Sequence, residues 1–106
     1  MTTYPNDESA LKNARRMVES GLAACASTFQ VKSIYVWRGE IEEADESIVL
    51  FKTTARLARR LINEVAKSHP YEVPEIVEFT PSFVNRSYLK WLVESVRMKR
   101  GTSGAR

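Results

Sequence analysis

The sequence predicts one α+β domain in which helices cover one face of an antiparallel sheet. The chain has 106 residues, the usual size of one domain, with 43% hydrophobic and 27% charged residues. Two long strand-like segments, residues 23–37 and 40–54, are separated only by Arg38-Gly39, which is typical of a hairpin. Helix-like segments lie before and after this hairpin, and the resulting order, β-α-β-β-α-β plus a C-terminal helix, is that of a ferredoxin-like sandwich.

The first two elements are a short strand and a helix. Residues 2–4 fit a strand that Pro5 ends, and Asn6 is suited to cap the helix that follows. Gly21 is a natural stop for that helix. The apolar residues that we expect on its buried face are Leu11, Ala14, Met17, Val18 and Leu22.

The second half of the chain is predicted to contain two more helices and one more strand. Residues 55–68 have helical periodicity and stop before Pro70. Residues 73–79 are predicted as a short strand, and residues 85–98 as the last helix. The face of the helix over 55–68 that we expect to be buried contains Leu57, Leu61, Ile62 and Val65.

The hairpin is apolar on both of its faces. Because side chains alternate along a strand, Tyr35 and Trp37 point to one face while Ile34 and Val36 point to the other. A sheet covered on one side alternates apolar and polar residues instead. The pattern therefore favours a second copy of the chain over the uncovered face. The alternative is that the last helix folds over that face.

Charge and composition separate the chain into a domain, residues 1–96, and a tail, residues 97–106. The net charge is +3, but the tail holds four basic residues and no acid, so the domain carries 12 basic and 13 acidic residues. We expect the basic tail to be disordered. A nucleic-acid partner is not expected, because no basic face with stacking aromatic residues is evident.

The chain is expected to be cytoplasmic and not membrane-bound. No apolar run approaches the roughly 20 residues that span a bilayer. The first residues have neither the basic nor the apolar region of a signal peptide. A single cysteine cannot form an internal disulfide, which fits a reducing compartment.

Cys25 and His69 are the candidate metal ligands. His69 is the one histidine, and it supports either metal ligation or proton transfer, or a structural role as a helix cap or interface hydrogen-bond donor. Cys25 has small apolar neighbours, which favours a buried core thiol, with a soft-metal ligand as the alternative. One Cys and one His do not complete a four-ligand zinc site.

A small-ligand cleft is the other candidate site. Lys52 interrupts an apolar strand and is suited to bind an anion or to pair with a carboxylate. Pro70 and Pro74 make the segment between them rigid, which positions Tyr71 and Glu72. Trp37, in the hairpin, completes the set of ligand-cleft candidates. An acidic run at residues 40–46 is either a solvated hairpin end or a weak site for a hard cation.

Two motifs carry a resemblance to a known family: His69-Pro70-Tyr71-Glu72-Val73-Pro74 and Trp37-Arg38-Gly39-Glu40-Ile41-Glu42. Shorter motifs agree in order and spacing along residues 2–96, and these are Thr3-Tyr4-Pro5, Leu22-Ala23-Ala24-Cys25, Lys52-Thr53 and Tyr88-Leu89-Lys90-Trp91-Leu92. With these motifs the chain resembles the CutA (divalent-ion tolerance) family.

The resemblance implies a ferredoxin-like homotrimer, similar to the PII signalling proteins, in which long hairpins pair between subunits. It also implies tolerance of divalent ions such as copper, metal bound by Cys25 and His69, no required cofactor and no enzymatic activity. Since some relatives have a second cysteine, we expect weak metal binding here. We also expect the short first strand to weaken the sheet unless neighbouring residues compensate.

Two other functions stay open. One is a PII-like trimeric sensor or scaffold that binds a small anionic ligand between subunits near Lys52 and Tyr71. The other is a small hydrolase or isomerase that uses His69 with Glu72.

Overall fold

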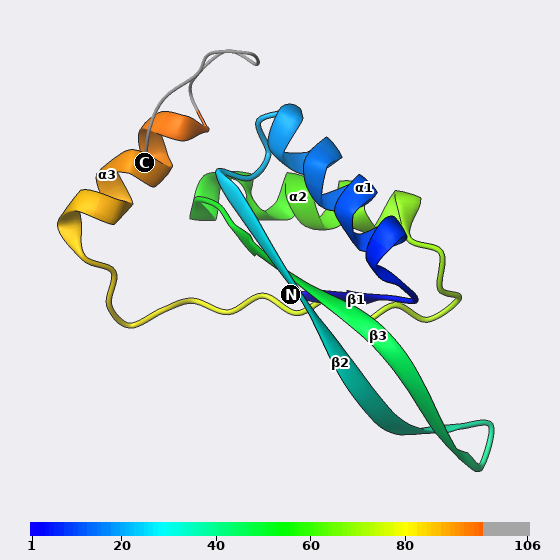
Figure 1. Cartoon of the computed structure of the whole chain (residues 1–106). Coiled ribbons are helices and arrows are strands. Elements are labelled where there is room, and N and C mark those ends of the chain that lie inside the picture. The colour runs from blue at the N-terminus through cyan, green and yellow to red at the C-terminus, as the bar shows by residue number, and fades with distance from the viewer. Residues whose placement is uncertain (97–106) are drawn as a thin grey trace.

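The computed structural model describes residues 1–96, which form an α+β fold with one three-stranded sheet (Figure 1). The predicted tail over 97–106, and the end of the predicted last helix, lie outside the described residues. No helix in this part of the chain is both long and apolar enough to cross a membrane. In chain order the elements are β1 (Thr2–Tyr4), α1 (Asp7–Glu19), β2 (Cys25–Trp37), β3 (Glu40–Lys52), α2 (Ala55–Ser68) and α3 (Arg86–Ser95).

The sheet has the order β1-β3-β2, and both pairings are antiparallel. Strands β2 and β3 pair along their whole length, from Cys25 opposite Lys52 to Trp37 next to the turn. Strand β1 pairs only with the last part of β3, where Thr2 lies opposite Val49. Helices α1 and α2 cover one face at this end, and the other end of the hairpin projects beyond them (Figure 1).

Residues 73–79 do not form the predicted strand. Ile76 makes an isolated antiparallel bridge to Thr2, and the amide of Val77 donates to the carbonyl of Met1 at 3.0 Å. Pro74 has no N–H to donate, and the residues after Val77 run past the first residue of β1, so the pairing cannot lengthen. The segment still lies along the free edge of β1, where a fourth strand of the sheet would be.

Helix α1 begins where the sequence predicts. The Asn6 side chain accepts a hydrogen bond from the Ser9 amide at 2.8 Å, and Gly21, with φ of 80°, follows the helix end. The predicted buried face is wrong for Leu11 and Val18, which are 55% and 37% exposed. Small alanines face the sheet instead and let the helix approach it closely. The buried residues of α1 are Ala10, Ala14 and Met17.

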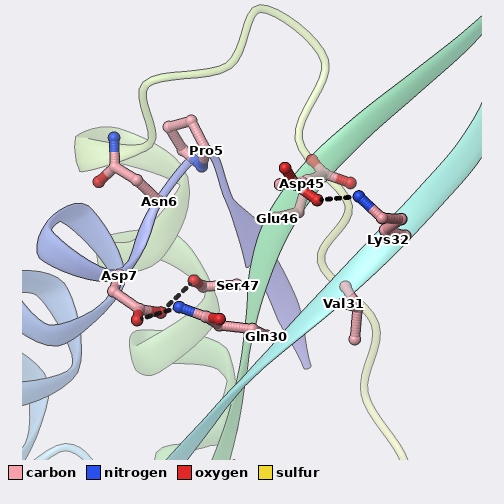
Figure 2. Close-up of a pocket in the computed structure, with 9 residues that line it drawn as sticks. All are labelled: Pro5, Asn6, Asp7, Gln30, Val31, Lys32, Asp45, Glu46 and Ser47. Atoms are coloured by element: carbon pink, nitrogen blue, oxygen red, sulfur yellow. Dashed lines mark hydrogen bonds and ion pairs between the residues drawn. The ribbon is translucent and has the colours of Figure 1, made fainter.

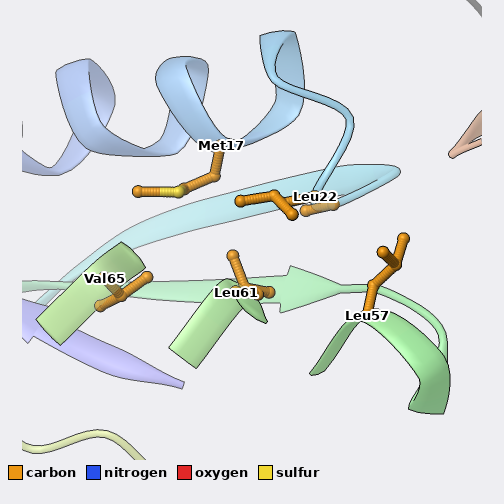
Figure 3. Close-up of a cluster of buried hydrophobic side chains, with 6 residues drawn as sticks. Met17, Leu22, Leu57, Leu61 and Val65 are labelled. Atoms are coloured by element: carbon orange, nitrogen blue, oxygen red, sulfur yellow. The ribbon is translucent and has the colours of Figure 1, made fainter. Parts of the chain in front are cut away.

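Two clusters of buried side chains make the core. One lies between β1, α1 and the sheet around Tyr4 and Val49. The other lies between α1 and α2, whose side chains turn toward each other in Figure 3. Each fully buried large apolar side chain contributes about 1.5–3 kcal/mol. The predicted face of α2 is confirmed, with Ile62 half-buried. The buried residues of the second cluster are Met17, Leu22, Ala23, Leu57, Leu61 and Val65.

The far half of the hairpin is apolar and exposed on both faces, as predicted. Ile34 and Val36 are 70% and 66% exposed on one face, and Tyr35 is 42% exposed on the other. Within the described chain, α3 does not cover the open face. Its Leu92 is buried, and Val96 at its end packs against the core cluster between α1 and α2. The alternative that assigned the last helix to this face is therefore wrong.

The hairpin turn predicts a specific effect of substitutions at Gly39. Arg38 and Gly39 have φ of 51° and 81°, as a two-residue hairpin loop with matching twist requires. Apart from Gly39 and its two chain neighbours, no described residue has a heavy atom within 4 Å of the position of an added Cβ, so a substitution meets only backbone strain. We expect Gly39→Ala to lower the free energy of unfolding by about 1 kcal/mol in urea titrations.

Gly39→Asn is the matched control, because asparagine tolerates positive φ. We expect its free energy of unfolding to lie between those of the wild type and Gly39→Ala. An alanine variant as stable as the wild type would contradict the role of this turn.

Candidate functional site

Residues 69–77 carry the most specific motif of the sequence, and they lie against the strands of the sheet. Helix α2 ends at Ser68, and the backbone becomes extended at His69, with φ of −72° and ψ of 134°. Pro70 comes next and cannot continue the helix. The chain therefore crosses from the helix to the edge of the sheet as predicted, although it does not continue there as a strand.

The His69 ring contacts side chains and backbone groups of β1 and of the segment that follows α2. Its Nε2 lies 3.1 Å from Thr2 Oγ1 on β1, and the Tyr71 amide donates to its Nδ1 at 3.2 Å. Its ring stacks on Tyr4, with ring centroids 4.6 Å apart and an interplanar angle of 11°. In the described part of the chain, no carboxylate hydrogen-bonds this ring to orient it for proton transfer. The contacts therefore favour a structural role for His69.

The surroundings of these rings disfavour their charged forms. Burial lowers the pKa of His69 from its ordinary value of 6.5, and a hydrogen bond with the Thr3 backbone opposes this shift. Burial raises the pKa of Tyr4 to about 12. Burial, followed by the hydrogen bond to Glu46, raises the pKa of Tyr71 above its ordinary value of 10.0. All three rings are therefore mainly neutral near pH 7.

Three of the four ligand-cleft candidates, Trp37, Tyr71 and Glu72, lie on or beside the part of the hairpin away from Lys52. The Tyr71 hydroxyl donates to Glu46 Oε2 at 2.5 Å. Arg38 Nη2 lies 3.5 Å from Glu72 Oε2, and the Arg38 guanidinium lies 5.4 Å from the Trp37 ring centroid. Arg38 therefore links Trp37 to the proline-bracketed segment. Arg38 is not among the site residues predicted from the sequence, although a cation in the hairpin turn beside Trp37 is a signal that could have found it.

Lys52, the fourth candidate, lies at the opposite end of the hairpin. Its Nζ donates to Ser27 Oγ at 2.6 Å, so the two side chains share one face of the sheet. One chain therefore does not bring Lys52 together with Tyr71. Glu72 pairs with Arg38, which leaves the proposed His69–Glu72 pair of a hydrolase or isomerase without support.

Cys25 pairs in register with Lys52 at the start of β2. Its thiol is free and half-buried, so it is not part of the core that the sequence favoured. It lines a groove with a volume of about 460 Å³, together with apolar residues of α1 and Trp91 of α3. Leu11 and Val18, the two exposed apolar residues of α1, form the helix side of this groove.

Cys25 and His69 do not share a site within one chain. Cys25 is on β2 and His69 contacts Thr2 on β1, with β3 between these strands. Adjacent strands are about 4.8 Å apart, so two spacings separate the strands, while two ligands of one ion lie within about 4.4 Å of each other. Within residues 1–96, no three His, Cys, Asp or Glu side chains form a group that could hold a metal ion.

A second groove of about 460 Å³ lies where α1 begins beside the hairpin (Figure 2). Asp7 accepts hydrogen bonds from Ser47 and Gln30, both at 2.5 Å. Lys32 donates to Asp45 at 2.8 Å across the hairpin. The Asp7 contacts attach α1 to the sheet, and the Lys32–Asp45 contact joins the two strands of the hairpin. The acidic run at 40–46 is therefore at least partly paired and not an assembled cation site.

The lowered pKa of His69 predicts a pH-dependent contribution to stability. The pKa of His69 is lower in the folded chain than in the unfolded chain, so the unfolded chain binds a proton at His69 more tightly. The contribution of neutral His69 to the free energy of unfolding is therefore fully present above its pKa in the unfolded chain, about 6.5. It is lost as the pH falls through its lower pKa in the folded chain. We expect the free energy of unfolding to fall between pH 7.5 and about 5.5.

Urea titrations of the wild type and His69→Gln at several pH values check this expectation. The glutamine variant should be less stable at pH 7.5 but should show a shallower decrease toward acid. An equal decrease in both proteins would assign the pH dependence to other groups.

Comparison with known proteins places this arrangement in one family. The family model described as CutA1 divalent ion tolerance protein matches residues 1–95. The divalent-cation tolerance protein CutA of Thermotoga maritima is 41% identical over 95 residues, covering 90% of this chain and 94% of that protein. Its counterpart of that name in Thermus thermophilus is 42% identical over 96 residues, covering 90% and 93%.

Solved structures agree with the fold. CutA from Synechococcus elongatus has a TM-score of 0.87 at 36% identity, covering 90% of this chain and 85% of that one. CutA1 from Pyrococcus horikoshii has a TM-score of 0.85 at 37% identity, covering 89% and 92%. This chain therefore belongs to the CutA1 divalent ion tolerance family.

Proposed function

We propose that this chain acts in divalent-ion tolerance as a cytoplasmic homotrimer and not as an enzyme. The observation that carries the proposal is the hairpin, whose far half is apolar on both faces and lies beyond its own helices (Figure 1). Ile34, Val36 and Ile41 are 70%, 66% and 72% exposed. A soluble chain needs a partner for such a surface, and the family resemblance favours two further copies of the same chain.

The edge of the sheet supports the same proposal. Strand β2 has 13 residues and pairs only with β3 among the described residues, so its other edge presents backbone groups for pairing. At the opposite edge, Ile76 bridges to β1. With that segment counted beside β1, the order supports a ferredoxin-like sheet with β2 at one edge. Hairpins that pair between subunits would cover both the edge and the apolar faces.

We further propose that the trimer binds copper, as Cu(I) or as the divalent Cu(II) ion, weakly through Cys25. A cysteine thiolate is a soft ligand that suits copper, and Cys25 is the one thiol of the chain. Because β3 separates Cys25 from His69, the His69 of the same chain is not a second ligand beside this thiol. The assembly requires no resident cofactor for folding. Weak binding follows because a tight structural site has four protein ligands.

A second candidate function is a scaffold that binds a small anion between subunits. It is favoured by the gathering of Trp37, Arg38, Tyr71 and Glu72 on the hairpin. The Arg38–Glu72 pair is exposed, with side-chain exposures of 73% and 72%, so an incoming anion could replace the carboxylate at low cost. Lys52 could join this set only from another chain.

If the hairpins pair between subunits, a charge introduced on the far half of the hairpin should weaken assembly of the trimer. We expect Val36→Asp to weaken assembly by about a hundredfold or more, since an unpaired buried charge costs about 3 kcal/mol. Analytical ultracentrifugation at micromolar concentrations measures this as loss of the threefold mass. Leu11→Asp, at a 55% exposed site on α1, is the control and should leave the mass unchanged. A wild-type chain that sediments as a monomer would refute the proposed assembly.

The metal proposal predicts that Cys25→Ser weakens Cu(I) binding at least about a hundredfold, since even residues outside the ligand shell contribute about 10- to 100-fold. Competitive titration with a chromogenic chelator measures the affinity. Ser27→Ala, two residues along the same strand, is the control and should bind normally. Unchanged binding in Cys25→Ser would exclude this site.

A melting temperature raised by phosphate or nucleotides but not by copper would favour the anion scaffold.

A further inference from the structure

Both ring nitrogens of His69 are already used within the chain. The Tyr71 amide can only donate, so Nδ1 accepts from it at 3.2 Å and carries no proton in the neutral ring. The proton of the neutral ring is therefore on Nε2, which lies 3.1 Å from Thr2 Oγ1. The one lone pair of the ring that could bind a metal ion faces an amide of its own chain. A metal ion would have to displace that hydrogen bond.

The stacking contact fixes the ring further. Tyr4 is fully buried, and its ring lies nearly parallel to the imidazole, with centroids 4.6 Å apart, so an imidazole that swung away would uncover Tyr4. The Tyr71 ring also contacts the imidazole, and the two ring centroids are 5.3 Å apart. Turning Nδ1 toward solvent would therefore break the Tyr71 and Thr2 hydrogen bonds and the Tyr4 stack together.

The same ring begins a row of contacts along β1. After His69 reaches Thr2, Glu75 accepts a hydrogen bond from Thr3 Oγ1 at 3.1 Å. Farther along, the Met1 amine donates to the Val77 carbonyl at 2.9 Å, and the Val77 amide donates back to Met1 at 3.0 Å. These contacts join residues 69–77 to the edge of a strand that has only three residues.

We propose that His69 is the latch that fastens residues 69–77 to β1, in the Nε2–H tautomer, and that it does not ligate metal. The residues present thus do not fit the ligand set that the family resemblance implies. The part that concerns metal rests on the proposed function, because it holds that copper bound by this protein uses Cys25 without His69. The latch itself does not depend on that function.

Nitrogen-15 NMR of the wild-type protein tests the latch directly. His69 is the one histidine of the chain, so its ring signals need no assignment by mutation. We expect the Nε2–H tautomer at pH 8, with ring shifts that stay unchanged when Cu(I) or Zn(II) is added. The Nδ1–H tautomer, or ring shifts that move with the added ion, would overturn the proposal. Unmoved Cys25 signals would refute the metal proposal alone.

His69→Phe separates the two roles in a variant. Phenylalanine keeps a ring for Tyr4 but loses both hydrogen bonds, so we expect amide exchange at Tyr71 and Val77 to rise about tenfold. Cu(I) affinity should stay within about twofold of the wild type, a difference well below 1.4 kcal/mol. Lys67→Ala, in the last turn of α2, is the control and should change neither measurement. Lost Cu(I) binding with unchanged exchange would show a ligand in place of a latch.

Discussion

The burial of β1 is the constraint on which the rest of the structure depends. Thr2, Thr3 and Tyr4 are 1%, 6% and 0% exposed, although the strand has only three residues and two of them are polar. A buried hydroxyl without a hydrogen bond costs free energy, so both threonines need partners where the sheet leaves none. His69 and Glu75 supply these partners. The irregular segment after α2 thus takes its course because a short buried strand needs it there.

Much of the fold could be predicted from local patterns in the sequence. Asn6 as a cap, the hairpin around Gly39 and the helix over 55–68 each depend on neighbouring residues, and such signals are visible in one dimension. The predictions that proved wrong concern segments whose structure depends on residues far away in the sequence. Residues 73–79 look like a strand by composition, but they lack a partner strand long enough to pair with. Leu11 looked buried by periodicity, but the alanines beside it allowed the helix to turn its small face to the sheet.

The candidate site could be predicted only in pieces, for the same reason. The proline-bracketed motif correctly marked a non-helical crossing, and Arg38 links Trp37 to it. The family resemblance grouped Cys25 with His69, and the anion hypothesis grouped Lys52 with Tyr71 between subunits, so neither grouping came from the geometry of one chain. The sheet order separates the first pair by a strand, and the length of the hairpin separates the second. The sequence shows which single residues are chemically suited to bind a ligand. Which of them lie close together depends on the strand order and register, which the sequence alone did not reveal.

The pairing of Met1 with Val77 has a consequence for how the protein is handled. The antiparallel alignment places Thr2 beside Ile76 and Met1 beside Val77, so a residue fused before Met1 would lie beside Glu78, and the next beside Phe79. An amino-terminal purification tag would also abolish the charged amine that contacts the Val77 carbonyl. Such a tag would continue the chain beyond the start of β1, which is an edge strand of the three-stranded sheet. Tagged and untagged preparations therefore differ at this contact as well as in mass.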